Sequence, residues 1–94
     1  VTYHMPNAFT PNGDSKNEYF LGLGVLDGMG SFEMSIWDRW GGRVFKTNDP
    51  KEGWNGRFEN SGSNLPNGVY VYLVRYTTPR NQLIELKGFA NLIR

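Results

Sequence analysis

The sequence contains no cysteine and only one histidine, His4. A disulfide framework and a thiolate metal site are therefore excluded, as is a metal centre built from several histidines. No apolar run approaches the roughly 18 residues of a membrane-spanning helix, and the start shows no basic segment followed by an apolar one. These absences leave a small domain that is held together by its own core.

The chain also lacks an excess of charge of either sign. Ten Lys and Arg residues face nine Asp and Glu residues, which gives a formal net charge of +1. A protein that follows a phosphate backbone or an anionic membrane usually carries a basic patch or stripe, so we expect no nucleic-acid partner. At this length we expect residues 1–94 to form a single domain, monomeric in isolation. Because the chain begins at Val1 rather than at a methionine, we expect it to be part of a longer polypeptide.

The apolar pattern favours strands over helices. "SFEMSIWD" at 31–38 alternates between apolar and polar residues, and "GVYVYLVRYTT" at 68–78 predicts a strand buried on both faces for much of its length. Further candidates are "YFLGLG", "RVFKT" and "LIELKGFANLIR", and 49–53 could close one helical turn. Turn signals rich in Gly, Asn and Pro separate these segments. The pattern predicts an all-β, Ig-like antiparallel β-sandwich of about seven strands.

Candidate catalytic groups are few. General acid–base catalysis needs carboxylates or imidazoles that converge in a cleft. Here most of the nine acids lie in turn-like segments, where Asp is expected for its hydrogen bonds to the backbone, and the single histidine lies near the first strand. We therefore expect that the protein is not an enzyme.

Oxygen-bearing residues recur at every second position early in the chain. The side chains of Asn12, Asp14 and Glu18, with a backbone carbonyl near residue 16, could surround a structural calcium ion. The stretch offers only two carboxylates and contains Lys16, so the alternative is an Asx turn in which Asp14 and Asn17 bond backbone amides. We expect no cofactor apart from this open calcium alternative.

The second distinctive segment is "WDRWGGRVFKT" at 37–47. Its glycine pair lets the chain reverse with positive φ before a returning strand. Trp37 and Trp40 could stack on a sugar or on a partner's side chain. Alternatively they pack at the corner of the sandwich, with Arg39 laid against an indole.

The order of these pieces carries a resemblance. "MPNAFTPNGDSKNEYF", "SIWDRWGGRVFKT", "EGWNG", "LPNGVYVYLVRY" and "KGFANLIR" follow one another in this sequence. Together they resemble the gliding motility-associated C-terminal domain, the type B C-terminal domain carried by cargo of the bacterial type IX secretion system. Departures from the family pattern are few, and Asn55 in "WNG", where the family commonly has Asp, keeps an acceptor for the turn.

The resemblance implies an Ig-like sandwich that serves as an address at the end of large exported proteins, including gliding adhesins. Such a domain directs passage from the periplasm across the outer membrane through the type IX translocon, helped by outer-membrane partner proteins. The expected partners are this machinery and the upstream cargo domains of the same chain. The expected destination is the cell surface or the medium.

Two segments are candidates for contact with that machinery. The terminal strand could be recognised through β-augmentation or capture of its carboxylate, and the glycine within it indicates a bulge or a close approach of backbone. It could equally be a plain strand whose side chains only pack. The candidate contact residues are Lys87, Gly88, Leu92 and Arg94, followed by Arg39, Trp40 and Gly41 as second choice.

Two functions of another class stay open on the sequence. Aromatic residues make up 15% of the chain, enough to line a carbohydrate-binding face. That function requires Trp37, Trp40 or Trp54 to be exposed in a coplanar row. The other alternative is a passive stalk or adhesin repeat.

Overall fold

Strands make up most of the regular secondary structure. The structure is a computed structural model that describes residues 2–11 and 18–94. The described residues form seven strands and one short 3-10 helix. These are β1 (Thr2–His4), β2 (Ala8–Phe9), β3 (Leu23–Val25), β4 (Phe32–Trp37), β5 (Arg43–Thr47), η1 (Phe58–Asn60), β6 (Gly68–Thr77) and β7 (Leu83–Leu92). The predicted all-β class is confirmed.

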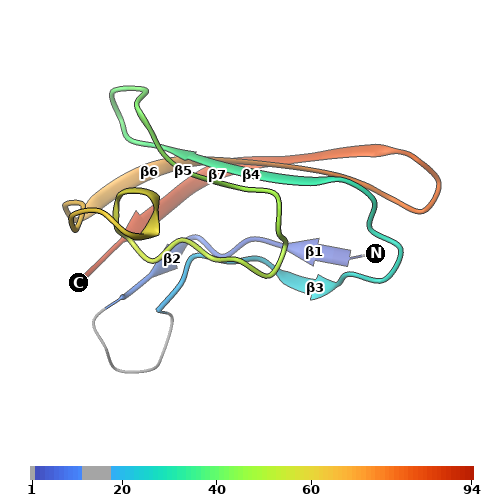
Figure 1. Ribbon diagram of the computed structural model, residues 1–94, viewed down its shortest axis with the longest axis horizontal. Coiled ribbons are helices and arrows are strands. Elements are labelled where there is room, and N and C mark those ends of the chain that lie inside the picture. The colour runs from blue at the N-terminus through green and yellow to red at the C-terminus, as the bar shows by residue number, and fades with distance from the viewer. Residues whose placement is uncertain (1, 12–17) are drawn as a thin grey trace.

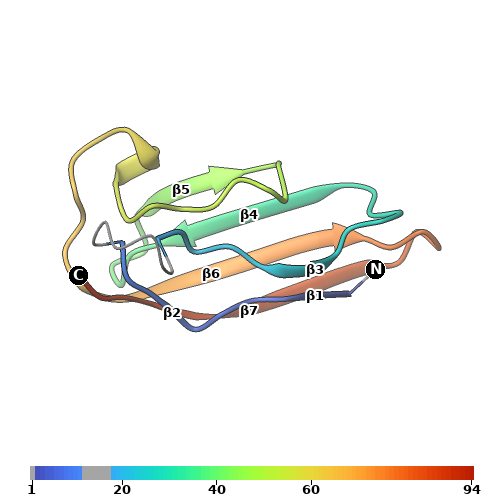
Figure 2. The same ribbon diagram turned by 90° about the horizontal axis from the view of Figure 1, so that it is seen from below.

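The strands form two sheets. One has the order β2-β7-β6-β4-β5, and the other pairs β1 with β3. Figures 1 and 2 show that the small sheet lies against one side of the large sheet, as in a sandwich. All pairings are antiparallel except that of β2 with β7, which is parallel through Ala8↔Asn91 and Phe9↔Leu92. The predicted antiparallel sandwich therefore carries one parallel pairing at this edge, where the chain crosses from β1 to the large sheet and runs in the direction of β7.

An aromatic core fills the space between the sheets. At one end Tyr3 of β1 packs edge-on against Phe32 and Tyr76, with ring centroids 5.6 and 5.8 Å apart. At the other end Phe9 lies 5.1 Å from the fully buried Trp54, centroid to centroid. Offset and edge-to-face pairs of this kind contribute about 0.5–1.5 kcal/mol each beyond the area they bury. The core therefore extends along the length of the sandwich without a disulfide.

The side of the large sheet that faces away from the small sheet, here called the outer face, carries apolar side chains in the open. Val69 and Val71 of β6 are 48% and 36% exposed, whereas Tyr70 and Val74 on the other side of the same strand are buried. The prediction that this strand is buried on both faces is therefore wrong. The small sheet covers one side only, and none of the described strands covers the other (Figure 1).

Strand boundaries follow the sequence patterns closely in most places. β5 coincides with the predicted 43–47 segment, and β4 lies within 31–38. The predicted strand at 19–24 is only partly formed. Phe20 makes an isolated bridge to Trp54, with N···O distances of 2.7 and 3.1 Å, before β3 begins at Leu23. At the predicted helical turn, 49–53, the Glu52 amide donates to the Asp49 carbonyl, which closes a simple turn and not a helix.

Candidate recognition surface

The terminal strand β7 presents its candidate residues on different sides. Lys87 is exposed on the outer face, opposite Leu73. Gly88 faces the core side, and a Cβ at this position would lie 3.0 Å from the Tyr72 hydroxyl oxygen. The β6–β7 register runs continuously through Tyr72↔Gly88. The expected bulge is therefore absent, and the close approach comes from the Tyr72 side chain.

Leu92 and Arg94 hold the end of the chain to the domain. Leu92 is buried in the core, and its backbone pairs with Phe9. The Arg94 guanidinium donates hydrogen bonds to the carbonyls of Leu65 and Gly56, the latter at 2.7 Å. The Arg94 amide also donates to Asn67 Oδ1 at 3.2 Å. This arrangement, here called the Arg94 clamp, joins the C-terminal strand to the 56–67 segment.

The loop beneath the clamp is built from the "WNG" motif. The Trp54 indole N–H donates to the Arg57 carbonyl at 2.9 Å. Asn55 Oδ1 accepts from the Arg57 amide at 3.0 Å, which confirms that Asn55 serves this turn as an acceptor. Gly56 has a φ of +84°, a left-handed conformation that favours glycine. Because Trp54 is fully buried, it cannot contribute to an exposed row of aromatic side chains for sugar binding.

The 38–42 turn between β4 and β5 is fixed by Asp38. Asp38 Oδ1 accepts from the amides of Trp40 at 3.0 Å and Gly42 at 2.8 Å, as expected of an Asx turn. Gly41 has a φ of +87°, which confirms the predicted need for glycine at this reversal. The turn leaves Trp40 78% exposed. The Arg39 guanidinium carbon lies 4.8 Å from the centre of the Trp40 ring, so Arg39 lies against an indole as the corner-packing alternative predicted, but Trp40 itself does not pack at the corner.

A pocket separates this turn from the start of β6. Its lining includes Arg39 and Trp40 on one side and Pro66, Asn67 and Val69 on the other. Tyr70 also lines the pocket and donates its hydroxyl hydrogen to the Pro66 carbonyl at 2.7 Å. Burial raises the pKa of Tyr70, and the nearby positive charge of Arg94 only partly offsets this. The turn and the C-terminus thus lie at the same end of the molecule (Figure 1).

The outer face was not singled out from the sequence. Trp37, Val71 and Phe89 lie side by side across β4, β6 and β7, through the register pairs Trp37↔Val71 and Val71↔Phe89. We call these three residues the apolar row, and Phe89 is 63% exposed. The signal was present as Val69, Val71 and Leu73 at alternate positions, but a buried strand has the same composition. Only the layer arrangement shows that these side chains face outward.

Several acids of the described residues serve turns and ion pairs. Glu85 accepts from Arg75 at 2.7 Å, and Glu33 lies 3.5 Å from Lys46. Asp49 accepts from the Lys51 amide at 2.8 Å. No group of three or more His, Asp or Glu side chains in the described residues could hold a metal ion. Asn12 and Asp14 of the calcium alternative lie outside the described residues, so that alternative stays a prediction.

Among residues 2–11 and 18–94, the structure contains no helix with the length and apolarity needed to cross a membrane. The fold and the surface define a small β-sandwich in which an aromatic core supports an exposed surface at one end. Comparison with curated proteins finds no match. Comparison with protein families finds that the CHU_C type IX secretion signal domain matches residues 3–92.

The chain belongs to the family of CHU_C type IX secretion signal domains. The resemblance seen in the sequence is thereby confirmed. A type IX secretion signal implies export across the outer membrane to the cell surface or the extracellular space. The family is one of secretion signal domains.

Proposed function

We propose that residues 1–94 form the C-terminal sorting signal of a larger exported protein, such as a gliding adhesin. The domain directs this cargo through the type IX system by binding outer-membrane proteins associated with the translocon. It passes through the periplasm in transit and has no catalytic role of its own. The family match over residues 3–92 is the observation that carries this proposal.

The exposed surface at the clamp end supports binding as the mode of action. Trp40 is a large aromatic side chain that the fold leaves open to solvent, and Arg39 stacks on it. Aromatic and Arg residues of this kind are enriched among the residues that dominate binding energy at interfaces. We assign direct contact to Arg39, Trp40 and Lys87. Gly41 shapes the turn, while Gly88, Leu92 and Arg94 hold the surface in place.

The proposal is tested by fusing the chain to the C-terminus of a periplasm-directed fluorescent protein in a bacterium with a working type IX system. We expect the fusion to become accessible to external protease or to appear in the medium. Inactivating the translocon should abolish this export. Retention of the folded fusion in the periplasm, with the outer-membrane partners present, would contradict the proposal and favour a carbohydrate-binding or stalk module.

A matched pair of variants tests the contact residues. Trp40→Ala removes an exposed aromatic side chain from the 38–42 turn. Leu83→Ala removes an apolar side chain that is 59% exposed, at the start of β7, which is the end of that strand away from the turn. We expect export to fall for Trp40→Ala and to persist for Leu83→Ala. Equal export of the two would remove Trp40 from the binding surface.

A further inference from the structure

Charge on the outer face is distributed unevenly around the apolar row. Arg43 of β5 pairs in register with Trp37, so a basic side chain continues the row at one edge. Lys87 of β7 lies two residues before Phe89 on the same face, and Arg39 lies in the turn beyond Trp37. The half of the face near the 38–42 turn is therefore apolar and basic.

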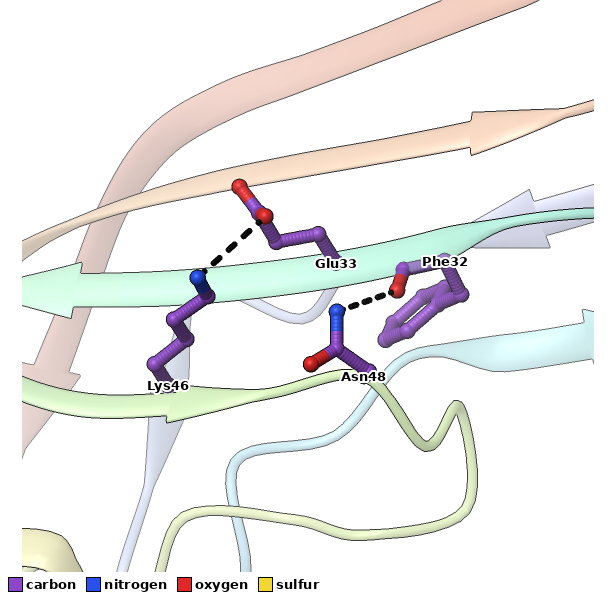
Figure 3. A network of polar contacts seen from close by, with 4 residues as sticks. All are labelled: Phe32, Glu33, Lys46 and Asn48. Atoms are coloured by element: carbon purple, nitrogen blue, oxygen red, sulfur yellow. Dashed lines mark hydrogen bonds and ion pairs between the residues drawn. The ribbon is translucent and has the colours of Figure 1, made fainter.

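The acids of this face are occupied elsewhere. Glu33 pairs with Lys46, as Figure 3 shows, and the ion pair lies further along β4 from the apolar row. Glu85 pairs with Arg75 on the neighbouring strand. Within the described residues, Arg39, Arg43 and Lys87 have no carboxylate within ion-pair distance. Three exposed cations therefore surround the apolar row, and none of them forms an ion pair with a described carboxylate.

We propose that this apolar–basic surface, made of the apolar row with Arg39, Arg43 and Lys87, docks an acidic protein segment of the export machinery. Apolar side chains of that segment cover the row, and its carboxylates meet the three cations. The four register positions from Arg43 to Phe89 span three strand spacings, about 15 Å. That width accommodates one helix of about 10–12 Å diameter with its flanking side chains. The inference rests on the proposed function and specifies the chemistry of the partner.

Charge argues against two other occupants. Two copies of the chain packed through this surface would bring the three cations of each copy together, while Glu33 and Glu85 are already paired within each copy, and like charges in an interface are repulsive. Anionic membranes are recognised by clusters of about four to eight Lys or Arg residues. This surface has three, in a chain whose net charge is only +1.

The test uses two pairs of matched variants in the export fusion. Phe89→Thr removes the most exposed member of the apolar row, and Leu83→Thr makes the same type of change on the same face of β7 at its far end. Arg43→Glu reverses a charge beside the row, and Arg80→Glu reverses one in the distant turn before β7. Circular dichroism and urea unfolding check that each variant folds. Since the two changes lie on different strands, either one carries the test if the other unfolds.

We expect Phe89→Thr and Arg43→Glu each to lower the exported fraction about tenfold, the effect of losing one central interface contact. The two control variants should be exported like the native chain. If all four folded variants are exported equally, the docking surface is refuted while the sorting function stands. If the native chain is not exported at all, the proposed function fails and this inference fails with it.

The identity of the occupant is tested in the same cells. A photoreactive amino acid replaces Phe89, and in the control it replaces Leu83. We expect light-dependent crosslinking from position 89 alone, to a protein segment with Asp or Glu near the linked residue. A crosslink to lipid, to a second copy of the chain, or to a segment without acids would overturn the proposal.

Discussion

The Arg94 clamp makes a measurable prediction about the end of the chain. Arg94→Ala removes two guanidinium hydrogen bonds, to the carbonyls of Gly56 and Leu65. The Gly56 carbonyl keeps a second donor, the Leu65 amide at 2.9 Å. Hydrogen bonds to charged groups contribute about 1.5–3 kcal/mol each when shielded, and solvent at this exposed end reduces that value. We therefore expect a loss of about 1–3 kcal/mol in the free energy of unfolding.

Urea unfolding followed by tryptophan fluorescence measures this loss, since Trp54 reports on the core next to the clamp. With an m-value of about 1–3 kcal/mol/M, the midpoint should fall by roughly 1 M. Arg94→Lys should recover only part of the loss, because an ammonium lacks the planar fork of donors. Arg80→Ala in the distant turn is the control and should leave the midpoint unchanged.

Export of the same variants separates packing from recognition. If Arg94 acts through the clamp, export of Arg94→Ala should fall only as far as its folded fraction falls. An unchanged urea midpoint together with lost export would refute the claim that Arg94 acts by stabilising the fold. It would show instead that the partner contacts Arg94 directly. Deleting residues 88–94 should abolish both folding and export, because the deletion removes Leu92 from the core as well as the clamp.

Three further predictions concern the backbone and pH. Gly56→Ala should lower stability by about 1–3 kcal/mol from its positive φ, and by more than Gly41→Ala, which has the same strain but open space around it. Burial raises the pKa of Tyr3, and a backbone contact with Gly22 only partly offsets this. As pH rises above about 10, the unfolded state therefore loses the Tyr3 hydroxyl proton before the folded state does, and the free energy of unfolding declines. In urea unfolding measured against pH, Tyr3→Phe should make this decline of the midpoint shallower. Asp38→Ala should cost about 1–2 kcal/mol and speed amide exchange in the 38–42 turn, whereas Asp38→Asn keeps the acceptor and should cost less.

Local patterns predicted the strands well. β5 coincides with the 43–47 prediction, and β7 occupies 83–92 of the predicted 83–94. Each of these segments is specified by its alternating pattern and by the turn residues beside it. These two signals lie within a few positions of one another in the sequence. Asp38 and Gly41 could likewise be assigned to the turn from sequence, since their bonds are local.

Non-local arrangement decided what the sequence left open. Leu92 is buried because β2, more than 80 positions earlier, pairs beside it. The Arg94 clamp depends on carbonyls of residues 56 and 65, which no spacing rule connects to the end of the chain. The exposure of Phe89 depends on the absence of a covering layer among the described residues. Alternating Val and Leu on a strand look the same in sequence whether or not another sheet packs on them.

Direct binding to the machinery tests the central claim most closely. The native chain is passed over immobilised translocon complexes, purified with their outer-membrane partners, and surface plasmon resonance records the association. We predict saturable binding that Trp40→Ala and Phe89→Thr each weaken about tenfold, while Leu83→Thr leaves it unchanged. Absence of saturable binding by the folded native chain would contradict the claim that the translocon and its partners bind this domain.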